Sequence, residues 1–103
     1  MDGFASGEGG EVLEIMVKTF SVYVLQSLKD GRHYIRNTQD IGERIKRHNA
    51  GDYRYTKGHR PWRLVYKEVV KSRSEAVKLE RFFKSGAGRK TLKKKILDSV
   101  NKP

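Results

Sequence analysis

The sequence contains no cysteine, so it offers neither the disulfide framework of many secreted domains nor a thiolate ligand for a metal. It also lacks any run approaching the ~18 consecutive apolar residues that a membrane-spanning helix requires. Residues 1–15 carry four acidic and no basic side chains, and they lack the charged start and apolar stretch of a secretory signal. We therefore expect a cytoplasmic protein that does not associate with membranes.

Acidic side chains are scarce beyond this first segment. The chain of 103 residues has 23 lysines and arginines against 12 aspartates and glutamates, which gives a net charge of +11. Because four of the acids lie in residues 1–15, the remainder carries a net charge of +15. Such a surface attracts polyanions and releases counterions when it meets a phosphate backbone. Nucleic acid is the expected partner, although charge alone does not separate a nuclease from a structural RNA-binding protein.

The length allows one domain with a modest core. Residues 1–10 contain four glycines and too few bulky apolar side chains to offset the entropy that is lost on ordering. We therefore expect a disordered leader over residues 1–15, to which we assign no function, and a single folded domain over residues 16–103.

Three segments have the alternation of strands. Residues 20–25 predict a strand with one fully apolar face and Tyr23 on the other face, and residues 33–36 predict a second strand after a glycine turn. The longest candidate covers residues 62–70, with Trp62, Leu64 and Tyr66 on one face. Both faces of this last segment look partly covered, which is typical of a central strand.

Capping boxes mark two helices. Asp40 begins a helix predicted over residues 41–49, and Ser72 begins another that we expect to end at Gly86. A lysine-rich terminal helix follows. The intervening residues 51–61 have no period and predict an exposed basic, aromatic loop. These elements predict an α+β fold, a small, mainly antiparallel three-stranded sheet flanked by helices.

Glu80 is the most informative residue for function. Helical spacing places it on one stripe with Ala76 and Phe83, and a carboxylate on such a stripe is costly to bury unless a cation or metal meets it. The spacing leaves open the alternative that Glu80 lies at the edge of the stripe and pairs with Lys84 or Arg81 in solvent.

Arg44 and His48 form a second candidate pair. Four residues apart on a helix, they share a face and could both contact one phosphate. Neighbouring Lys46 and Arg47 leave open the alternative of a solvated basic face.

The order of Tyr23, Tyr34, Arg44, His48 and Glu80 resembles the GIY-YIG nuclease family, particularly its small single-domain members. The resemblance covers roughly residues 19–96. The two half-motifs are present as Ser21-Val22-Tyr23 and Tyr34-Ile35-Arg36.

The resemblance implies a metal-dependent DNA endonuclease that hydrolyses phosphodiester bonds. It implies that Glu80 binds the metal, that Tyr23 activates water, and that Arg44 stabilises the transition state, while Tyr34 and His48 position the phosphate. A single carboxylate suits Mg²⁺, for which Mn²⁺ could substitute. Zinc is not expected, because the histidines show no ligand-pair spacing.

Two departures from the family pattern keep an alternative open. Arg36 stands where the motif has glycine, so its side chain could crowd the substrate or add a phosphate contact. The family's late asparagine has no obvious counterpart, since Asn101 is too far downstream. The alternative is a catalytically silent domain that binds branched or single-stranded DNA or RNA.

The remaining candidates for nucleic-acid contact are basic or aromatic. They are Arg36, Tyr53, Arg54, Tyr55, Lys57, Arg60, Lys93, Lys94 and Lys95. The two tyrosines could stack on unpaired bases. A domain of this size offers one site, so we expect a monomer or weak dimer, and the pathway, whether DNA repair, mobility or restriction, stays open.

Overall fold

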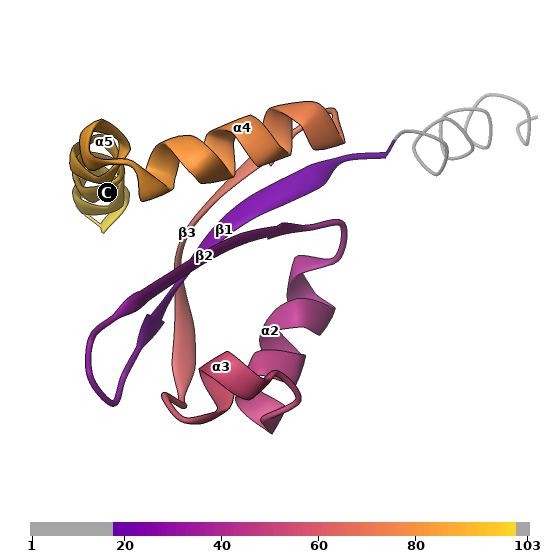
Figure 1. Cartoon of the computed structure of the whole chain (residues 1–103), viewed down its shortest axis with the longest axis vertical. Helices are drawn as coiled ribbons and strands as arrows, with labels where there is room; N and C mark the ends of the chain where they lie inside the picture. Colours follow the sequence, from indigo (N-terminus) through magenta and orange to yellow (C-terminus); the bar gives the residue numbers. More distant parts are fainter. Residues whose placement is uncertain (1–17, 101–103) are drawn as a thin grey trace, which may run out of the picture.

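The computed structural model describes residues 18–100, so the expected leader at residues 1–15 and Asn101 lie outside the part described. Along the chain the elements are β1 (Phe20–Ser27), β2 (His33–Thr38), α2 (Ile41–Ala50), α3 (Arg54–Lys57), β3 (Trp62–Val70), α4 (Arg73–Lys84) and α5 (Gly86–Val100). The strands form one antiparallel sheet in the order β2-β1-β3, with helices on both faces (Figure 1). The predicted α+β class is confirmed. None of the helices in this part of the chain is long and apolar enough to span a bilayer.

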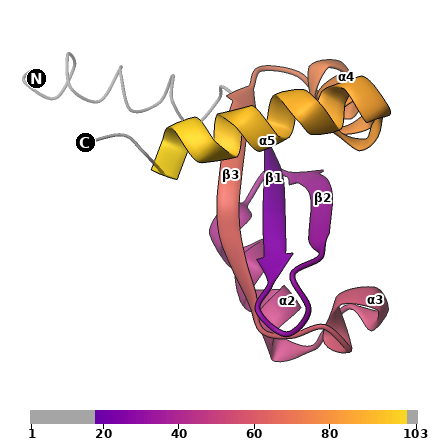
Figure 2. The ribbon, with the colours of Figure 1, turned by 90° about the vertical axis from the view of Figure 1, so that its left-hand side faces the viewer.

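The central strand is β1, and both of its faces are buried. Phe20, Val22 and Val24 belong to a cluster covered by α4 and α5, whereas Tyr23 and Leu25 belong to a second cluster on the side of α2. Figure 2 shows α5 crossing the sheet on the α4 side. The predicted alternation over residues 20–25 is therefore confirmed, but its polar-looking face is also covered.

The strand β3 has the predicted bounds, but it lies at an edge of the sheet, so its expected central place is wrong. Its expected faces are also wrong. Leu64 and Tyr66 pair with consecutive residues of β1, which leaves Val65 as a bulge. The bulge turns Tyr66 toward the first cluster, where Val65 also packs, while Trp62 stays in the second. Simple alternation cannot foresee this, because it assumes one residue opposite each partner.

The helix α2 begins at the predicted residue and ends one residue later than predicted, before Gly51. The backbone N–H of Glu43 donates to Asp40 Oδ1 at 3.0 Å, which satisfies one free donor of the first turn. Gly51 has a φ of 87° and donates to the carbonyl of His48 at 3.2 Å. This left-handed position suits glycine, and it turns the chain toward α3.

The segment at residues 51–61 is not the wholly exposed loop that its composition predicts. It contains α3, and Thr56 within α3 is fully buried. The indole Nε1 of Trp62 donates to the Thr56 carbonyl at 2.8 Å. The Asn49 side chain holds the Trp62 backbone through two hydrogen bonds, of 2.7 and 3.0 Å. Tertiary contacts thus hold this segment in place, which explains why its sequence shows no helical periodicity.

The helices α4 and α5 meet at a tight corner. Ser85, rather than the expected Gly86, caps the end of α4, and α5 begins at Gly86. Ser85 Oγ donates to the Phe82 carbonyl at 2.6 Å and accepts from the N–H of Gly88 at 3.0 Å. One hydroxyl therefore serves the last turn of one helix and the first turn of the next, so no linker is needed.

The corner predicts a stability difference between its two glycines. A Cβ at Gly88 would lie 1.5 Å from the Phe82 carbonyl oxygen, so Gly88→Ala should lower the free energy of unfolding by roughly 1–3 kcal/mol or more. The control Gly86→Ala meets nothing within 4 Å and should be neutral or stabilising by up to ~1 kcal/mol. Urea unfolding measures both, and equal stabilities would contradict the close approach of the helices.

Candidate active site

Tyr23 and His48 meet beneath the surface on the α2 side of the sheet. The Tyr23 hydroxyl lies 3.1 Å from His48 Nε2, and the two residues are 0% and 1% exposed. The phenol on the central strand thus reaches a residue of α2 that lies 25 positions later in the sequence. Tyr23 is not a strand tyrosine with its hydroxyl in solvent, because the α2 side covers it.

The second ring nitrogen of His48 also has a partner. Its Nδ1 lies 2.8 Å from the Thr56 hydroxyl oxygen, so both nitrogens are engaged by protein atoms. The ring therefore presents no free nitrogen for the phosphate contact that the resemblance implies. Sequence reasoning missed Thr56, since a lone threonine in a polar segment carries no signal of burial.

Burial sets the protonation of this pair. Burial, and to a lesser degree the neighbouring Tyr34, raises the pKa of Tyr23 well above its ordinary value, against the opposing effect of Arg44 and Arg36. Burial, together with charge repulsion from the same two arginines, lowers the pKa of His48 to about 4. Near neutral pH the phenol is therefore protonated and the imidazole is uncharged.

Tyr34 covers the pair on the side of a groove. Its ring contacts that of His48 edge-on, with centroids 5.0 Å apart, and Tyr55 stacks on it at 5.8 Å. The guanidinium of Arg36 lies 4.9 Å from the centre of the Tyr34 ring. Arg44 instead approaches the Tyr53 ring, at 5.4 Å. The two arginines therefore approach different rings of one aromatic cluster.

Glu80 stands beside this cluster with its side chain 17% exposed. Its Oε1 accepts from the Asn37 amide at 2.8 Å, and its Oε2 accepts from Lys84 Nζ at 2.8 Å. Arg36 Nη1 lies 3.7 Å from Oε2. Glu80 is thus partly buried, and it also makes the alternative pairing with Lys84. Arg36 joins the aromatic cluster to the carboxylate, a link that no spacing in the sequence reveals.

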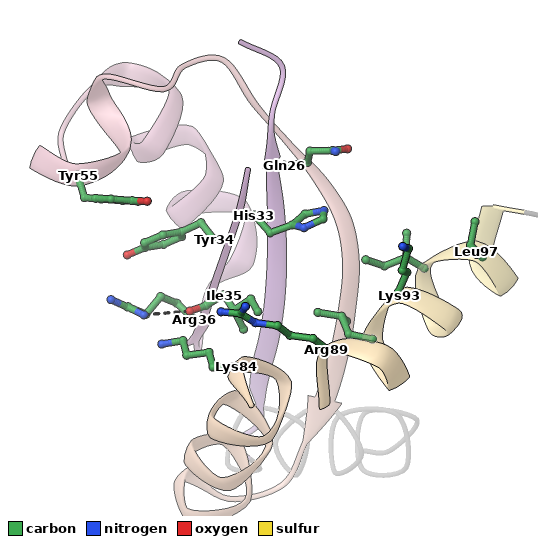
Figure 3. Close-up of a pocket in the computed structure, with 12 residues that line it drawn as sticks. Gln26, His33, Tyr34, Ile35, Arg36, Tyr55, Lys84, Arg89, Lys93 and Leu97 are labelled. Carbon is green, nitrogen blue, oxygen red and sulfur yellow. Dashed lines mark hydrogen bonds between the residues drawn. The ribbon is translucent and has the colours of Figure 1, made fainter. Parts of the chain in front are cut away.

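A groove of about 1000 Å³ lies between β2 and α5 (Figure 3). Every charged side chain that lines it is basic, and these are Arg36, Lys84, Arg89 and Lys93. Ile35, Leu92 and Ile96 add apolar surface, and the Tyr34 and Tyr55 rings border the groove beside Arg36. The groove can therefore take a ligand with both negative charge and flat apolar surface. Sequence reasoning named Lys84 only as a partner of Glu80 and did not single out Arg89, because no local pattern shows that either residue lines a groove with β2.

The three terminal lysines do not act as one patch. Lys93 lines the groove, whereas Lys95 lies 3.8 Å from Glu68 and 6.0 Å from the centre of the Tyr66 ring. Successive residues of a helix point about 100° apart, so Lys94 between them is exposed in a further direction. Exposed positions on or beside α3 are held by Arg54, Lys57 and Arg60, which are not among the residues that line the groove.

Comparisons with known proteins confirm the resemblance that the sequence predicts. The family model described as the GIY-YIG catalytic domain matches residues 19–94. A UPF0213 protein of Staphylococcus saprophyticus is 41% identical over 73 residues, which cover 70% of this chain and 88% of that protein. A UPF0213 protein of Staphylococcus aureus strain N315 is 37% identical with the same coverage. The solution NMR structure of a UPF0213 protein from Bacillus halodurans is 37% identical, covers 81% of this chain and 85% of its own, and gives a TM-score of 0.45.

The protonation of His48 predicts a pH dependence of stability. The folded protein keeps His48 neutral down to its pKa of about 4, whereas an unfolded chain gains this proton near the ordinary pKa of 6.5. Between these values the unfolded chain binds more protons, so the free energy of unfolding should fall as the pH is lowered. His48→Gln retains hydrogen-bonding groups but does not titrate, so it should lack this part of the slope. Urea unfolding across the range measures the difference, and an NMR pKa near 6.5 for folded His48 would contradict it.

Proposed function

The chain belongs to the GIY-YIG family, and on this premise we propose that it is a metal-dependent DNA endonuclease that hydrolyses phosphodiester bonds. The observation that carries the proposal is the buried hydrogen bond between the Tyr23 hydroxyl and His48 Nε2, at the border of a basic groove. A hydroxyl beside an unprotonated imidazole is an arrangement that can remove a proton from water.

In this proposal Tyr23 takes the proton of the attacking water. Because burial raises the pKa of Tyr23, free tyrosinate is scarce, and the hydroxyl must release its own proton as it accepts another. Nε2 of His48, 3.1 Å away, receives that proton. The water oxygen then bonds to phosphorus as the bond to the leaving oxygen breaks. His48 thus acts on the proton rather than on the phosphate, because both ring nitrogens are already bonded within the protein.

The arginines serve the charge that develops on the phosphoryl oxygens. Arg44 lies one turn before His48 on α2, and its donors suit the oxygens of the transition state. Arg36 and Tyr34 line the groove, where they hold the scissile phosphate. Arg36 is thereby a phosphate clamp, and it takes the place of the motif glycine without closing the site.

We propose Glu80 as the ligand of Mg²⁺, with Mn²⁺ as a substitute. Within residues 18–100 no three His, Asp or Glu side chains gather as a metal cluster, and Mg²⁺ is the ion that accepts one or two carboxylates and keeps its waters. The carboxylate oxygens of Glu80 fit this use, provided that the exposed, flexible Lys84 exchanges its contact for a phosphate. When bound, the ion would polarise the scissile phosphate and stabilise the departing oxygen.

The groove supports DNA as the substrate. Lys84, Arg89 and Lys93 offer charge for a phosphate backbone, and the Tyr34–Tyr55 stack offers a flat surface for an unpaired base. Branched or single-stranded DNA would satisfy both features.

A silent nucleic-acid-binding domain is the second candidate. The position of Arg36 favours it, since this side chain reaches over Tyr34 and toward Glu80 where the motif has no side chain. In that case the groove would bind the strand but the water would have no place beside Tyr23.

Removal of one carboxylate oxygen tests the metal assignment. Glu80→Gln should abolish cleavage and weaken Mn²⁺ binding, as measured by paramagnetic resonance, while DNA affinity changes little, because a single carboxylate contributes nothing to the attraction of phosphates. Glu68→Gln is the matched control, since Glu68 is also partly exposed and contacts a lysine. It should cleave as the wild type does. Normal cleavage by Glu80→Gln would refute the assignment.

A pair of substitutions at Arg36 separates the two candidate functions. If Arg36 clamps a phosphate, both Arg36→Gly and Arg36→Gln should lower turnover by roughly 10-fold or more, since a charge-assisted hydrogen bond contributes ~1.5–3 kcal/mol. If the side chain only blocks the site, Arg36→Gly should raise turnover and Arg36→Gln should not. Single-turnover cleavage and binding assays distinguish these results, and binding without cleavage in all three proteins supports the silent domain.

A further inference from the structure

The proposed proton transfer requires one particular tautomer of His48, and the hydrogen bond between Thr56 and His48 bears on which tautomer forms. A neutral imidazole carries one N–H and one lone pair, so only one nitrogen of His48 can accept a proton. Burial lowers the pKa of His48 to about 4 and keeps the ring neutral. The proposed function requires the lone pair to be on Nε2, which faces Tyr23. The proton of the ring must then be on Nδ1, where it needs an acceptor.

The supply of acceptors around the ring decides between the two tautomers. If Nε2 carried the proton, it would donate to Tyr23, and the hydroxyl proton of Tyr23 would need another acceptor. Within residues 18–100 the Tyr23 hydroxyl has His48 as its only hydrogen-bond partner. Tyr23 is 0% exposed in the protein without substrate, so bulk water is not a second acceptor for it there. A buried donor without an acceptor costs ~1–3 kcal/mol. This tautomer is therefore disfavoured.

The other tautomer gives every proton an acceptor. Nδ1–H donates to the Thr56 oxygen at 2.8 Å, and the Tyr23 hydroxyl donates to Nε2 at 3.1 Å. The Thr56 hydroxyl proton in turn points toward the carbonyl of Tyr53, at 3.5 Å. This last contact is long, but it is the threonine-to-backbone contact that a helical turn allows. The three protons are thus donated in one direction, from Tyr23 through His48 and Thr56 to the carbonyl of Tyr53.

Thr56 is held rigidly enough to impose this order. It is 0% exposed, and its carbonyl accepts from the Trp62 indole at 2.8 Å and from the N–H of His59 at 3.1 Å. Its neighbours in α3, Arg54 and Lys57, point to solvent. A methyl group would fill the same space, so the buried hydroxyl has its evident use in the bond to His48.

We propose that Thr56 is a positioning residue, whose hydroxyl holds His48 with the proton on Nδ1 and so leaves Nε2 free to receive the proton of Tyr23. The inference rests on the proposed endonuclease function for its catalytic meaning. Its geometric part concerns the protein without DNA or metal. Thr56 does not contact the reacting atoms, and it acts only through the imidazole.

Nitrogen NMR tests the geometric part on the full chain without substrate. In the wild type, the ¹⁵N shifts of His48 should show a protonated Nδ1 and an unprotonated Nε2. Thr56→Val preserves the shape but leaves Nδ1–H without an acceptor, so the wild-type tautomer loses its advantage and a measurable share of His48 should carry the proton on Nε2. Thr56→Ser restores a hydroxyl and should retain the wild-type pattern. A proton on Nε2 in the wild type overturns the proposal, even if the valine variant fails to fold.

Cleavage assays then test the catalytic part. Thr56→Val should lower the turnover number by about 10²-fold or more, the range that general base catalysis supplies, with little change in the affinity for DNA. Thr56→Ser should recover most of the turnover. A valine variant that moves the proton and still cleaves at the wild-type rate overturns the positioning role. If wild-type protein has the expected tautomer and cleaves no DNA, the proposed function fails while the hydrogen bond stands.

Discussion

The buried hydroxyl of Tyr23 on the central strand constrains where several other elements of the molecule must lie. Both faces of β1 are buried, so the Tyr23 hydroxyl lies in an apolar cluster and must be hydrogen-bonded there. His48 meets it, which requires α2 to lie on this face. The second nitrogen of His48 then needs Thr56, and Thr56 needs the Trp62 indole to hold α3 in place. One buried polar group thus links the strand, two helices and the start of β3.

Much of the fold, and less of the candidate site, could be predicted from the sequence. The bounds of β3 and the cap at Asp40 follow from local patterns, and the structure has both. The edge position of β3 and its bulge could not be predicted, since they depend on pairing with β1. The burial of Thr56 and the place of Lys84 in the groove were not foreseen for a related reason. The burial of Thr56 follows from its contact with Trp62, and the place of Lys84 follows from the angle of α4. Neither is a local property of the sequence.

The carboxylate of Glu80 illustrates how two simple expectations can both be incomplete. Helical spacing offered a buried acid or a solvated ion pair, and the side chain combines features of each. Its apolar neighbours lie on α4, while its polar partners come from α4 and from Asn37 and Arg36 on β2. Asn37 thus places an asparagine amide beside the carboxylate, and it comes from a strand that precedes Glu80 in the sequence. A search for an asparagine downstream in the sequence could not find it.

The long sequence separation of these contacts has a consequence for folding. Tyr23 and His48 are 25 residues apart, and Asn37 and Glu80 are 43 apart, so each contact closes a large loop whose entropy must be paid before the contact forms. Short α3 cannot hold itself together in isolation. An incompletely folded chain therefore keeps its positive charge but has neither the ordered protons nor the carboxylate in place. Under the proposed function, such a chain would bind nucleic acid without cutting it, because only the complete tertiary structure brings the catalytic groups together.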